Sequence, residues 1–600
     1  MTVENVILEF SSELLPLPSN STTMRKSLLL LTSAFLIFTS IFSQENLPVG
    51  FSKEELQQME FIKNEPPVYI NQYGITTPPT SPVRNAAEWE EMRAVAITWT
   101  SYTSILKDIV KYAQMECQVY IICTDSNTVR NYLTSNGVPL TNIRCEQAPF
   151  NSVWIRDYGP NTCYTNDVDQ LILVDWIYNR PTRTKDDTVP SVIARDLNIP
   201  IYLTTQSPNN ITHTGGNFMS DGLGTAFSSK LIEQENSSKT EAQIDAVHNS
   251  FMGINRYIKM TVLPYDGIHH IDMHMKLLDE ETLLIGKYPT GISDGPQIEA
   301  NLQYVLSNYT SVFGTPYKVI RIPQPPETNG TWPNQGGDYL TYANASIVNN
   351  TVLVPQYYQQ YDTTAIRIWK ESMPGYKIVG INSNASISAS GSLHCIMHEI
   401  GANEPLLIVH QALQNTGNCF NPYQVDARIQ HKSGVASAKI WWTTDTTQPY
   451  QSATMTNTSG YNWQGFIPAQ ASTVEVFYYI EATSVSGKTM LRPMPAPSAY
   501  WKFKVTCTTA MTEILPPAIN PIYPNPSKGI TCIPVFSQTE TQGKISLMDV
   551  LGNEVRVIHD GKIPAGDKNF FINTMDVAAG TYVIRISTLN GVTAQRLVVR

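Results

Sequence analysis

The feature that most constrains the fold is an apolar strand pattern that recurs five times in the first two-thirds of the chain. Each copy follows a segment with helical spacing of apolar residues. Alternation alone would suit an ordinary α/β sheet, but near-regular spacing favours a cyclic repeat around a central axis. The expected helix and strand pairs are 104–115 with 118–123, 188–198 with 200–205, 239–253 with 257–264, 294–311 with 317–323, and 361–373 with 376–382.

The pattern changes after about residue 415. Short alternating strands without helical periodicity then predict a β-sandwich of immunoglobulin-like size, and a Thr/Pro-rich linker and a second all-β region follow. We therefore expect an N-terminal extension and signal peptide (1–44), a linker (45–65), an α/β domain (66–415), a β-sandwich (416–508), a linker (509–520) and an all-β C-terminal domain (521–600).

The N-terminus has the pattern of an export signal. Met24 is followed by Arg25 and Lys26, then by an apolar run that ends in small residues near Ser43. Residues 1–23 contain three glutamates, which do not suit a signal peptide, so Met24 is the expected start. The alternative is a membrane anchor, but the apolar run is a little short for one. We expect cleavage and export, with no stable membrane span afterwards.

Charge and cysteine content exclude other classes of protein. Charged residues make up 15% of the chain, the net charge is −10, and no Lys/Arg run stands out, so nucleic acid is not an expected partner. Eight cysteines in 600 residues are not a disulfide-rich framework. Cys419 and Cys507 bracket one segment and could pair.

Cys395 is the most informative candidate for a functional residue in the chain. It follows a run of small residues, stands next to His394 and precedes His398. A thiol beside an imidazole can be held as the thiolate, which is the reactive form. Cys395 is therefore a candidate nucleophile, with a metal ligand and a buried core cysteine as the alternatives.

Two further stretches carry titratable residues. Asp157 ends an apolar segment just before a turn, where a functional carboxylate and a salt bridge between Arg156 and a neighbour are equally good explanations. In the stretch 269–276, an extended backbone would place His270, Asp272 and His274 on one face. That face would suit acid/base chemistry or a metal.

Two aspartates, a histidine and a cysteine together specify a chemistry. Paired carboxylates bind a planar guanidinium through N–H···O bonds. Cys395 would attack the guanidinium carbon, and His270 would protonate the leaving ammonia and then activate water. Asp157 and Asp272 would hold the substrate. The product of such a reaction on arginine is citrulline.

Residues from about 66 to 412 resemble the Porphyromonas-type protein-arginine deiminases, which are related to agmatine deiminases in the guanidino-group modifying superfamily. The resemblance rests on Trp154-Ile-Arg-Asp-Tyr-Gly-Pro160, Thr214-Gly-Gly-Asn-Phe-Met-Ser-Asp-Gly222, His270-Ile-Asp272 and Ser392-Leu-His-Cys395. It implies a five-bladed α/β propeller (the pentein fold) and no cofactor or metal. It assigns guanidinium binding to Asp157 and Asp272, acid/base work to His270, nucleophilic attack to Cys395, and the pocket wall to Trp154, Asn217 and Asn344.

The sequence departs from this family at two places. The family grips a substrate's terminal carboxylate with two arginines separated by one residue, whereas Arg180 here is followed by Arg183. The family also has a tyrosine three residues before the catalytic histidine, where this chain has Gly267. Arg180 and Arg183 are therefore the expected substrate-binding arginines, and internal arginine, terminal arginine, free arginine and agmatine all remain candidate substrates.

The last eighty or so residues resemble the C-terminal sorting domain of the type IX secretion system, in Tyr523-Pro-Asn-Pro526, Asp549-Val-Leu-Gly-Asn-Glu-Val555 and Gly580-Thr-Tyr-Val583. This resemblance implies export across an outer membrane by the type IX machinery, followed by release or surface attachment.

The leading hypothesis is a secreted protein-arginine deiminase that acts on peptides or proteins. An agmatine-like small-molecule deiminase is the alternative among guanidino enzymes. A metal-dependent hydrolase is a different class and would use His270, Asp272, His274, Cys395 and His398. A surface adhesin on a degenerate enzyme scaffold is a third class, which the presence of all four reactive residues argues against.

Overall fold

The computed structural model describes residues 46–62, 73–507 and 515–600. The predicted signal peptide and parts of both predicted linkers lie outside these residues. Within the described ranges, no helix is both long and apolar enough to cross a membrane.

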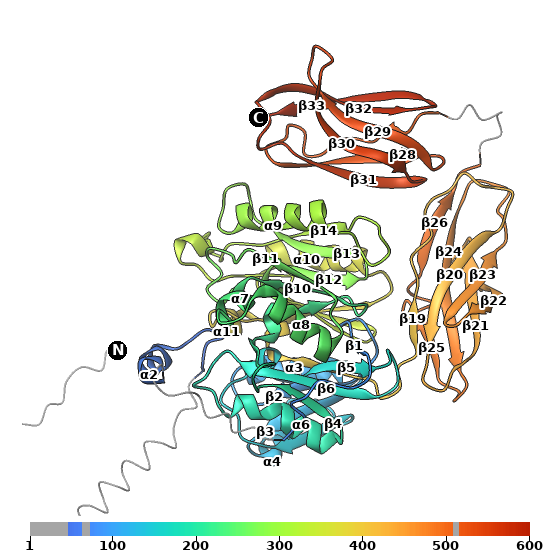
Figure 1. Ribbon diagram of the computed structural model, residues 1–600. Helices are drawn as coiled ribbons and strands as arrows, with labels where there is room; N and C mark the ends of the chain where they lie inside the picture. The colour runs from blue at the N-terminus through green and yellow to red at the C-terminus, as the bar shows by residue number, and fades with distance from the viewer. Residues whose placement is uncertain (1–45, 63–72, 508–514) are drawn as a thin grey trace, which may run out of the picture. The chain divides into compact units, whose positions relative to one another are not determined.

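Five separate small sheets form the mixed α/β part of the chain (Figure 1). In each, a central strand pairs antiparallel with one neighbour and parallel with the other. In the order antiparallel, central and parallel, the strands are β5 (Asn161–Thr165), β6 (Leu171–Tyr178) and β7 (Ile201–Thr204); β9 (Met219–Ser220), β10 (Thr225–Ser229) and β11 (Arg256–Met260); β12 (Met275–Asp279), β13 (Thr282–Lys287) and β14 (Lys318–Pro323); β15 (Ser346–Val348), β16 (Thr351–Gln356) and β17 (Lys377–Asn382); and β18 (His398–Gly401), β2 (Met92–Thr98) and β3 (Gln118–Cys123).

A helix links each central strand to its parallel neighbour, because parallel strands need a crossover connection. These helices overlap the five predicted helices, and the parallel strands overlap the five predicted strands, so the repeat units are confirmed as elements. The cyclic order of the sheets around an axis stays a prediction. The helices are α3 (Thr103–Ala113), α6 (Val189–Leu197), α8 (Glu241–Met252), α9 (Gly295–Asn308) and α10 (Gln359–Ser372).

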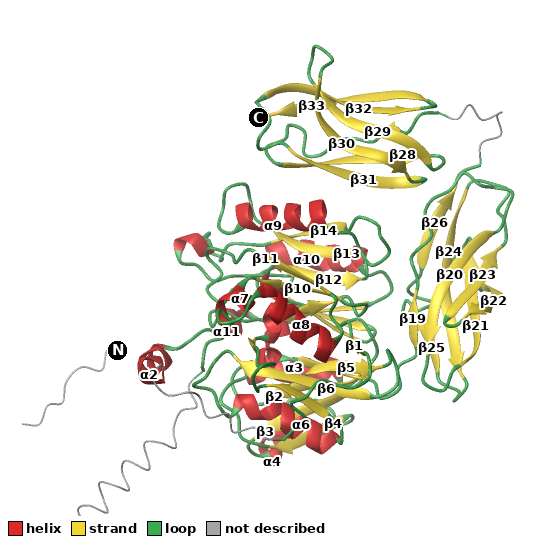
Figure 2. Ribbon diagram, in the orientation of Figure 1, coloured by secondary structure: helices red, strands yellow, loops and turns green. Residues whose placement is uncertain are grey.

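Strands alone follow residue 406 among the described residues (Figure 2). The first group has its own apolar core, which includes Val425, Ile440 and Tyr478. Its first strand starts before the predicted boundary at 416. The strands are β19 (Leu407–Val409), β20 (Tyr423–Gln430), β21 (Val435–Thr443), β22 (Gln451–Ser459), β23 (Asn462–Ile467), β24 (Val474–Ser484), β25 (Thr489–Arg492) and β26 (Trp501–Val505).

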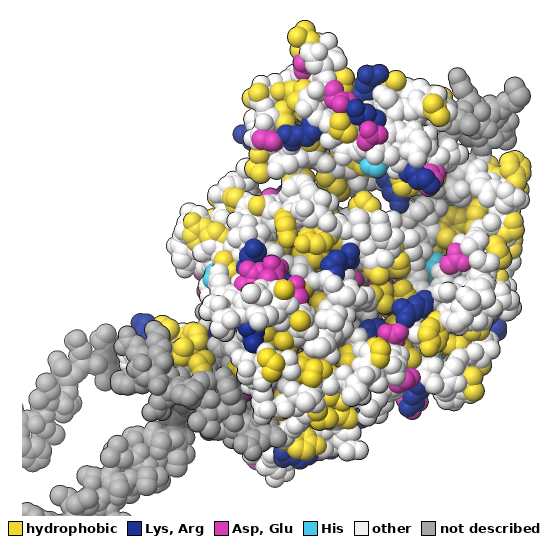
Figure 3. Space-filling view, in the orientation of Figure 1, with side chains coloured by type: hydrophobic (Ala, Val, Ile, Leu, Met, Phe, Trp, Pro, Cys, Tyr) yellow, Lys and Arg dark blue, Asp and Glu magenta, His cyan; other side chains and the backbone are white. Residues whose placement is uncertain are grey.

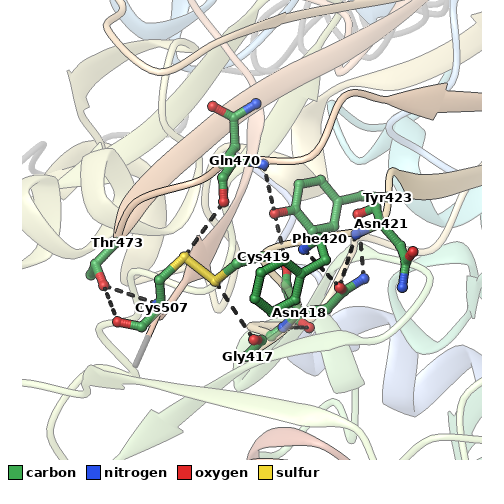
Figure 4. Close-up of a disulfide and its surroundings, with 10 residues drawn as sticks. Gly417, Asn418, Cys419, Phe420, Asn421, Tyr423, Gln470, Thr473 and Cys507 are labelled. Atoms are coloured by element: carbon green, nitrogen blue, oxygen red, sulfur yellow. Dashed lines mark hydrogen bonds between the residues drawn. A yellow bond between two sulfur atoms is a disulfide. The ribbon is translucent and has the colours of Figure 1, made fainter. Parts of the chain in front are cut away.

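A disulfide joins Cys419 to Cys507, across 88 residues of sequence (Figure 4). Cys419 lies shortly before β20 and Cys507 shortly after β26. The bond therefore ties together the two ends of this all-β region, as the bracketing in the sequence had suggested.

The C-terminal strands form two sheets around a third core, which includes Ile533, Ile545 and Ile584. The strands are β27 (Ala518–Ile519), β28 (Ile530–Ser537), β29 (Thr541–Met548), β30 (Glu554–Ile563), β31 (Gly566–Asn573), β32 (Gly580–Thr588) and β33 (Gly591–Val599). On the face shown in Figure 3, acidic and basic side chains are interspersed among uncharged ones.

Candidate active site

The candidate residues occupy the same position in each of the five sheets, in the turn that directly precedes the antiparallel strand. These turns touch one another: α5 (Ile155–Tyr158) lies against two others and thereby links them. Asp157 lies in α5 before β5, Asn217 in η2 (Gly215–Asn217) before β9, Asp272 in η3 (Ile271–Met273) before β12, Asn344 before β15, and Cys395 in η5 (His394–Ile396) before β18.

The structure brings the four predicted reactive side chains into one buried region. Cys395 and His270 are 0% exposed, and Asp157 and Asp272 are 1% exposed. Cys395 Sγ lies 3.9 Å from Asp272 Oδ2, and His270 Nδ1 lies 3.6 Å from Asp157 Oδ1. Asp272 Oδ1 is buried and has no hydrogen-bond partner among the described residues.

Asn344 holds the cysteine turn in place. Its side-chain Nδ2 lies 3.4 Å from Cys395 Sγ, and its Oδ1 accepts a hydrogen bond from the His394 backbone N–H at 3.0 Å. The same Nδ2 lies 3.4 Å from the Asp272 carbonyl oxygen. Asn344 therefore contacts both the thiol and the turn that carries the second aspartate.

Burial and charge keep the thiol neutral when no cation is bound. Burial raises the pKa of Cys395 well above its usual range, and the carboxylates of Asp272 and Asp157 raise it further. Burial also lowers the pKa of His270, against the opposing effect of the two carboxylates. A positive charge between the carboxylates would offset their effect on the thiol.

The glycine pair at 215–216 is required by the approach of two turns. A Cβ atom on Gly216 would lie 2.4 Å from His270 Nδ1, and one on Gly215 would lie 1.9 Å from the Arg156 carbonyl oxygen. A side chain at Gly216 would push His270 away from Asp157, and one at Gly215 would clash with the backbone of Arg156. The motif is thus explained by packing between the turns.

A chain of hydrogen-bonded polar side chains lies behind Asp272, and among them only His394 was noticed in the sequence. His394 Nδ1 lies 2.7 Å from Asp272 Oδ2, and its Nε2 lies 3.1 Å from Glu88 Oε2. Glu88 also pairs with Lys276. Burial would raise the pKa of Glu88, but Lys276 and His394 hold it well below its usual value. Glu88 lies in a loop and belongs to no pattern that would have singled it out.

The backbone across 270–274 is not extended, so the face that an extended strand would have given His270, Asp272 and His274 does not form. Residues Ile271–Met273 form a single 3-10 turn, so the side chain of His274 does not join those of His270 and Asp272. Both ring nitrogens of His274 are buried without a partner in the described part of the chain. His398 Nε2 instead lies 2.9 Å from the Pro160 carbonyl oxygen.

The side chains of the metal-hydrolase alternative are not gathered into one ligand set. Among residues 46–62, 73–507 and 515–600, no three His, Cys, Asp or Glu side chains are placed to hold a metal ion. Cys395 and Asp272 instead lie next to each other within the buried set of candidate catalytic residues.

The remaining predicted pocket residues are buried and have hydrogen-bond partners. The Asn217 side chain is bonded to the backbone of Ser229, with the N–H of Ser229 donating at 2.8 Å. Trp154, Arg180 and Arg183 contact an N-terminal segment, residues 47–55. Whether these residues also bind substrate stays a prediction.

Known proteins match the chain in two regions. Residues 82–400 match the family model for Porphyromonas-type peptidyl-arginine deiminase, and residues 521–600 match that for the secretion system C-terminal sorting domain. A Vibrio parahaemolyticus protein provisionally named an agmatine deiminase is 24% identical over 368 residues, which cover 54% of this chain and 99% of the relative. A Legionella pneumophila protein with the same provisional name is 26% identical over 268 residues, which cover 43% and 75%.

Solved structures are similar at lower identity. An agmatine deiminase of Enterococcus faecalis is 19% identical and covers 55% of this chain and 100% of its own, with a TM-score of 0.48. A provisionally assigned arginine deiminase from Porphyromonas gingivalis is also 19% identical and covers 54% and 99%, with a TM-score of 0.47.

Proposed function

Because the chain belongs to the Porphyromonas-type peptidyl-arginine deiminase family of guanidino-group hydrolases, we propose that it converts peptidyl arginine to citrulline and ammonia outside the cell. One observation carries the proposal: the buried Asp272 carboxylate lies beside the Cys395 thiol, with its Oδ2 3.9 Å from Sγ and its Oδ1 without a hydrogen-bond partner among the described residues. Asp157 lies in the turn that adjoins the Cys395 turn. Buried carboxylates require a compensating cation. A guanidinium supplies that charge and places its carbon next to the thiol.

The proposed reaction starts with proton transfer from the Cys395 thiol to His270. The substrate cation between Asp157 and Asp272 favours this step, because it cancels the carboxylate charges that raise the thiol pKa. The thiolate attacks the guanidinium carbon and forms a C–S bond. His270 then gives its proton to the departing nitrogen, the C–N bond breaks, and ammonia leaves.

Water completes the cycle. The S-linked amidino intermediate is attacked by a water molecule whose proton goes to His270. The C–S bond then breaks, the former water oxygen loses its second proton to solvent as the ureido carbonyl forms, and Cys395 regains its proton from His270. The neutral ureido product leaves, and water is the only co-reactant that the proposed reaction uses.

Peptides and proteins are the proposed substrates because the sorting domain indicates export through the type IX system to the cell surface or the medium. Agmatine or another small guanidino compound is the second candidate, since the relatives from Vibrio and Legionella carry that name. We also propose that the five sheets form the five-bladed propeller that the family resemblance implies.

A ureido-product assay tests the proposed function. The parent chain and Cys395→Ala should be compared on an internal-arginine peptide, a C-terminal-arginine peptide, free arginine and agmatine. We expect product from the peptides with the parent and none with Cys395→Ala. Asp272→Asn should lower the rate by roughly a hundredfold or more, since it removes charge stabilisation in a buried site.

Three outcomes would count against this assignment. Equal product from Cys395→Ala would refute the mechanism, and turnover of agmatine alone would favour the second candidate. Loss of activity in EDTA that added metal restores would favour the metal-dependent hydrolase.

A further inference from the structure

The segment 47–50 crosses the predicted pocket-wall residues and is held by its main chain. The Trp154 indole Nε1–H donates to the Leu47 carbonyl oxygen at 2.7 Å. Arg180 Nε donates to the Val49 carbonyl oxygen at 3.0 Å. Each donor bonds only to a backbone carbonyl oxygen. Both would therefore bind equally well whatever side chains stood at positions 47 and 49.

Arg183 contacts the same segment at two carbonyl oxygens and also pairs with Glu55, five residues beyond it. Its Nη2 donates to the carbonyl oxygens of Pro48 and Gly50 at 2.7 and 2.6 Å. Its Nε and Nη2 form a bidentate pair with the Glu55 carboxylate, at 2.8 Å each. Arg183 is 1% exposed; Glu55 is its ion-pair partner, and its Nη1 is buried without a hydrogen-bond partner among the described residues.

The segment packs against loops that carry the reactive residues. The Val49 N–H donates to the Ala389 carbonyl oxygen at 2.9 Å, and the Val49 side chain is 0% exposed. A Cβ on Gly391 would lie 2.7 Å from a Val49 methyl carbon, so the small-residue run before Cys395 makes room for Val49. The segment therefore packs against the loop that leads into Cys395.

We propose that Trp154, Arg180 and Arg183 line a groove that binds the main chain of an arginine-containing peptide, and that residues 47–55 occupy this groove as an intramolecular competitor. This inference rests on the proposed function and adds the substrate's main chain to it. A groove that hydrogen-bonds to backbone carbonyl oxygens suits peptide substrates that all contain an arginine but have different residues next to it. Residues 46–59 contain no arginine, so the bound segment has no guanidinium to offer the site.

Displacement of the segment should strengthen peptide binding. Glu55→Gln weakens the link to Arg183, while Glu54→Gln alters an exposed carboxylate on the same helix, α2 (Lys53–Ile62), and is the matched control. Each change is made in the full chain carrying Cys395→Ala, so that binding is measured without turnover. The fluorescence anisotropy of a labelled internal-arginine peptide should report at least a fivefold tighter Kd for Glu55→Gln and no change for Glu54→Gln.

A covalent lock gives the opposite result without depending on destabilisation. A Cβ on Gly50 would lie 3.8 Å from a methyl carbon of Ile268, so Gly50→Cys with Ile268→Cys can be tested as a disulfide pair. When oxidised, this variant should lose peptide binding, and reduction should restore it. Gly50→Cys alone, taken through the same oxidation and reduction, is the control.

The outcomes separate the two proposals. Equal peptide affinity in the Glu55→Gln, locked and unlocked forms would overturn the groove, even if the parent makes citrulline. Tighter binding by Glu55→Gln together with no ureido product from any substrate would instead refute the proposed function and leave the peptide groove in place.

Discussion

At the scale of single residues, the environment of the site disfavours the reactive thiolate form of Cys395 until a cation binds. Burial and two carboxylates keep the Cys395 thiol protonated, and burial lowers the pKa of His270, so the resting pair is neutral. A substrate that carries a positive charge would therefore help to generate its own nucleophile. A neutral substrate of the same shape would not.

This argument predicts opposite changes in thiol acidity and in rate for Asp157→Asn. Loss of one negative charge near Cys395 should move its titration to lower pH, because that charge helps to raise the thiol pKa. The rate on arginine peptides should nevertheless fall by roughly a hundredfold or more, since the substrate cation loses a partner. The ultraviolet absorbance of the thiolate, measured against the Cys395→Ala background, follows the titration.

Asp169→Asn is the control for that experiment, because Asp169 is exposed. It should change neither the thiol titration nor the rate. A Cys395 titration that stayed in place or moved to higher pH in Asp157→Asn would contradict the electrostatic argument.

At the scale of elements, the sequence predicted the repeats well and the short turns poorly. Each helix with its following strand is long and periodic, so apolar spacing was enough to locate it. The stretch 270–274 misled because it alternates in sequence like a half-exposed strand. All five of its residues are in fact buried, and in a fully buried stretch alternation does not distinguish a strand from a turn.

Contacts between residues that are distant in sequence also could not be predicted. Ser52 and Glu55 have the spacing of a helix-capping pair and do cap α2, which a local pattern can indicate. That Glu55 also pairs with Arg183 depends on tertiary contact across 128 residues. Glu88 and His394 meet across 306 residues for the same reason. By contrast, Asp157, His270, Asp272 and Cys395 could be singled out from the sequence because their residue types together suit a guanidinium, and the structure places them in one buried region.

The disulfide leads to a prediction about one group of elements. The bond between Cys419 and Cys507 closes a long loop around the strands β20 to β26, and loss of such a bond costs about 4 kcal/mol of unfolding free energy. The variant with Cys419→Ser and Cys507→Ser should unfold at lower denaturant concentration, as followed by tryptophan fluorescence. A reducing agent should shift the parent in the same direction and leave the double variant unchanged; a shift in both would point to a different cause.

At the scale of the whole molecule, the chain is divided into regions with separate cores. The buried apolar residues of the C-terminal core all lie between Ile522 and Val599. This region matches the sorting domain, which indicates a role in export. Catalysis and export are thus assigned to different parts of the chain.

Removal of residues 521–600 should separate these two roles. The truncated chain should keep its ureido-forming rate per molecule, because its site residues lie between Trp154 and Cys395 and share no core with the removed part. In cells, fractionation should find the full chain outside the outer membrane and the truncated chain inside it. A truncated enzyme that is exported normally would contradict the role of the sorting domain.

The placement of one site residue before each of five strands has a consequence for damage to the protein. The four reactive residues span positions 157 to 395 and come from three different sheets, so no short fragment contains a complete site. A protease cut within this span could yield inactive pieces that regain activity only when they reassociate. Fragment complementation would then measure how strongly the sheets bind one another, with citrulline formation as the signal.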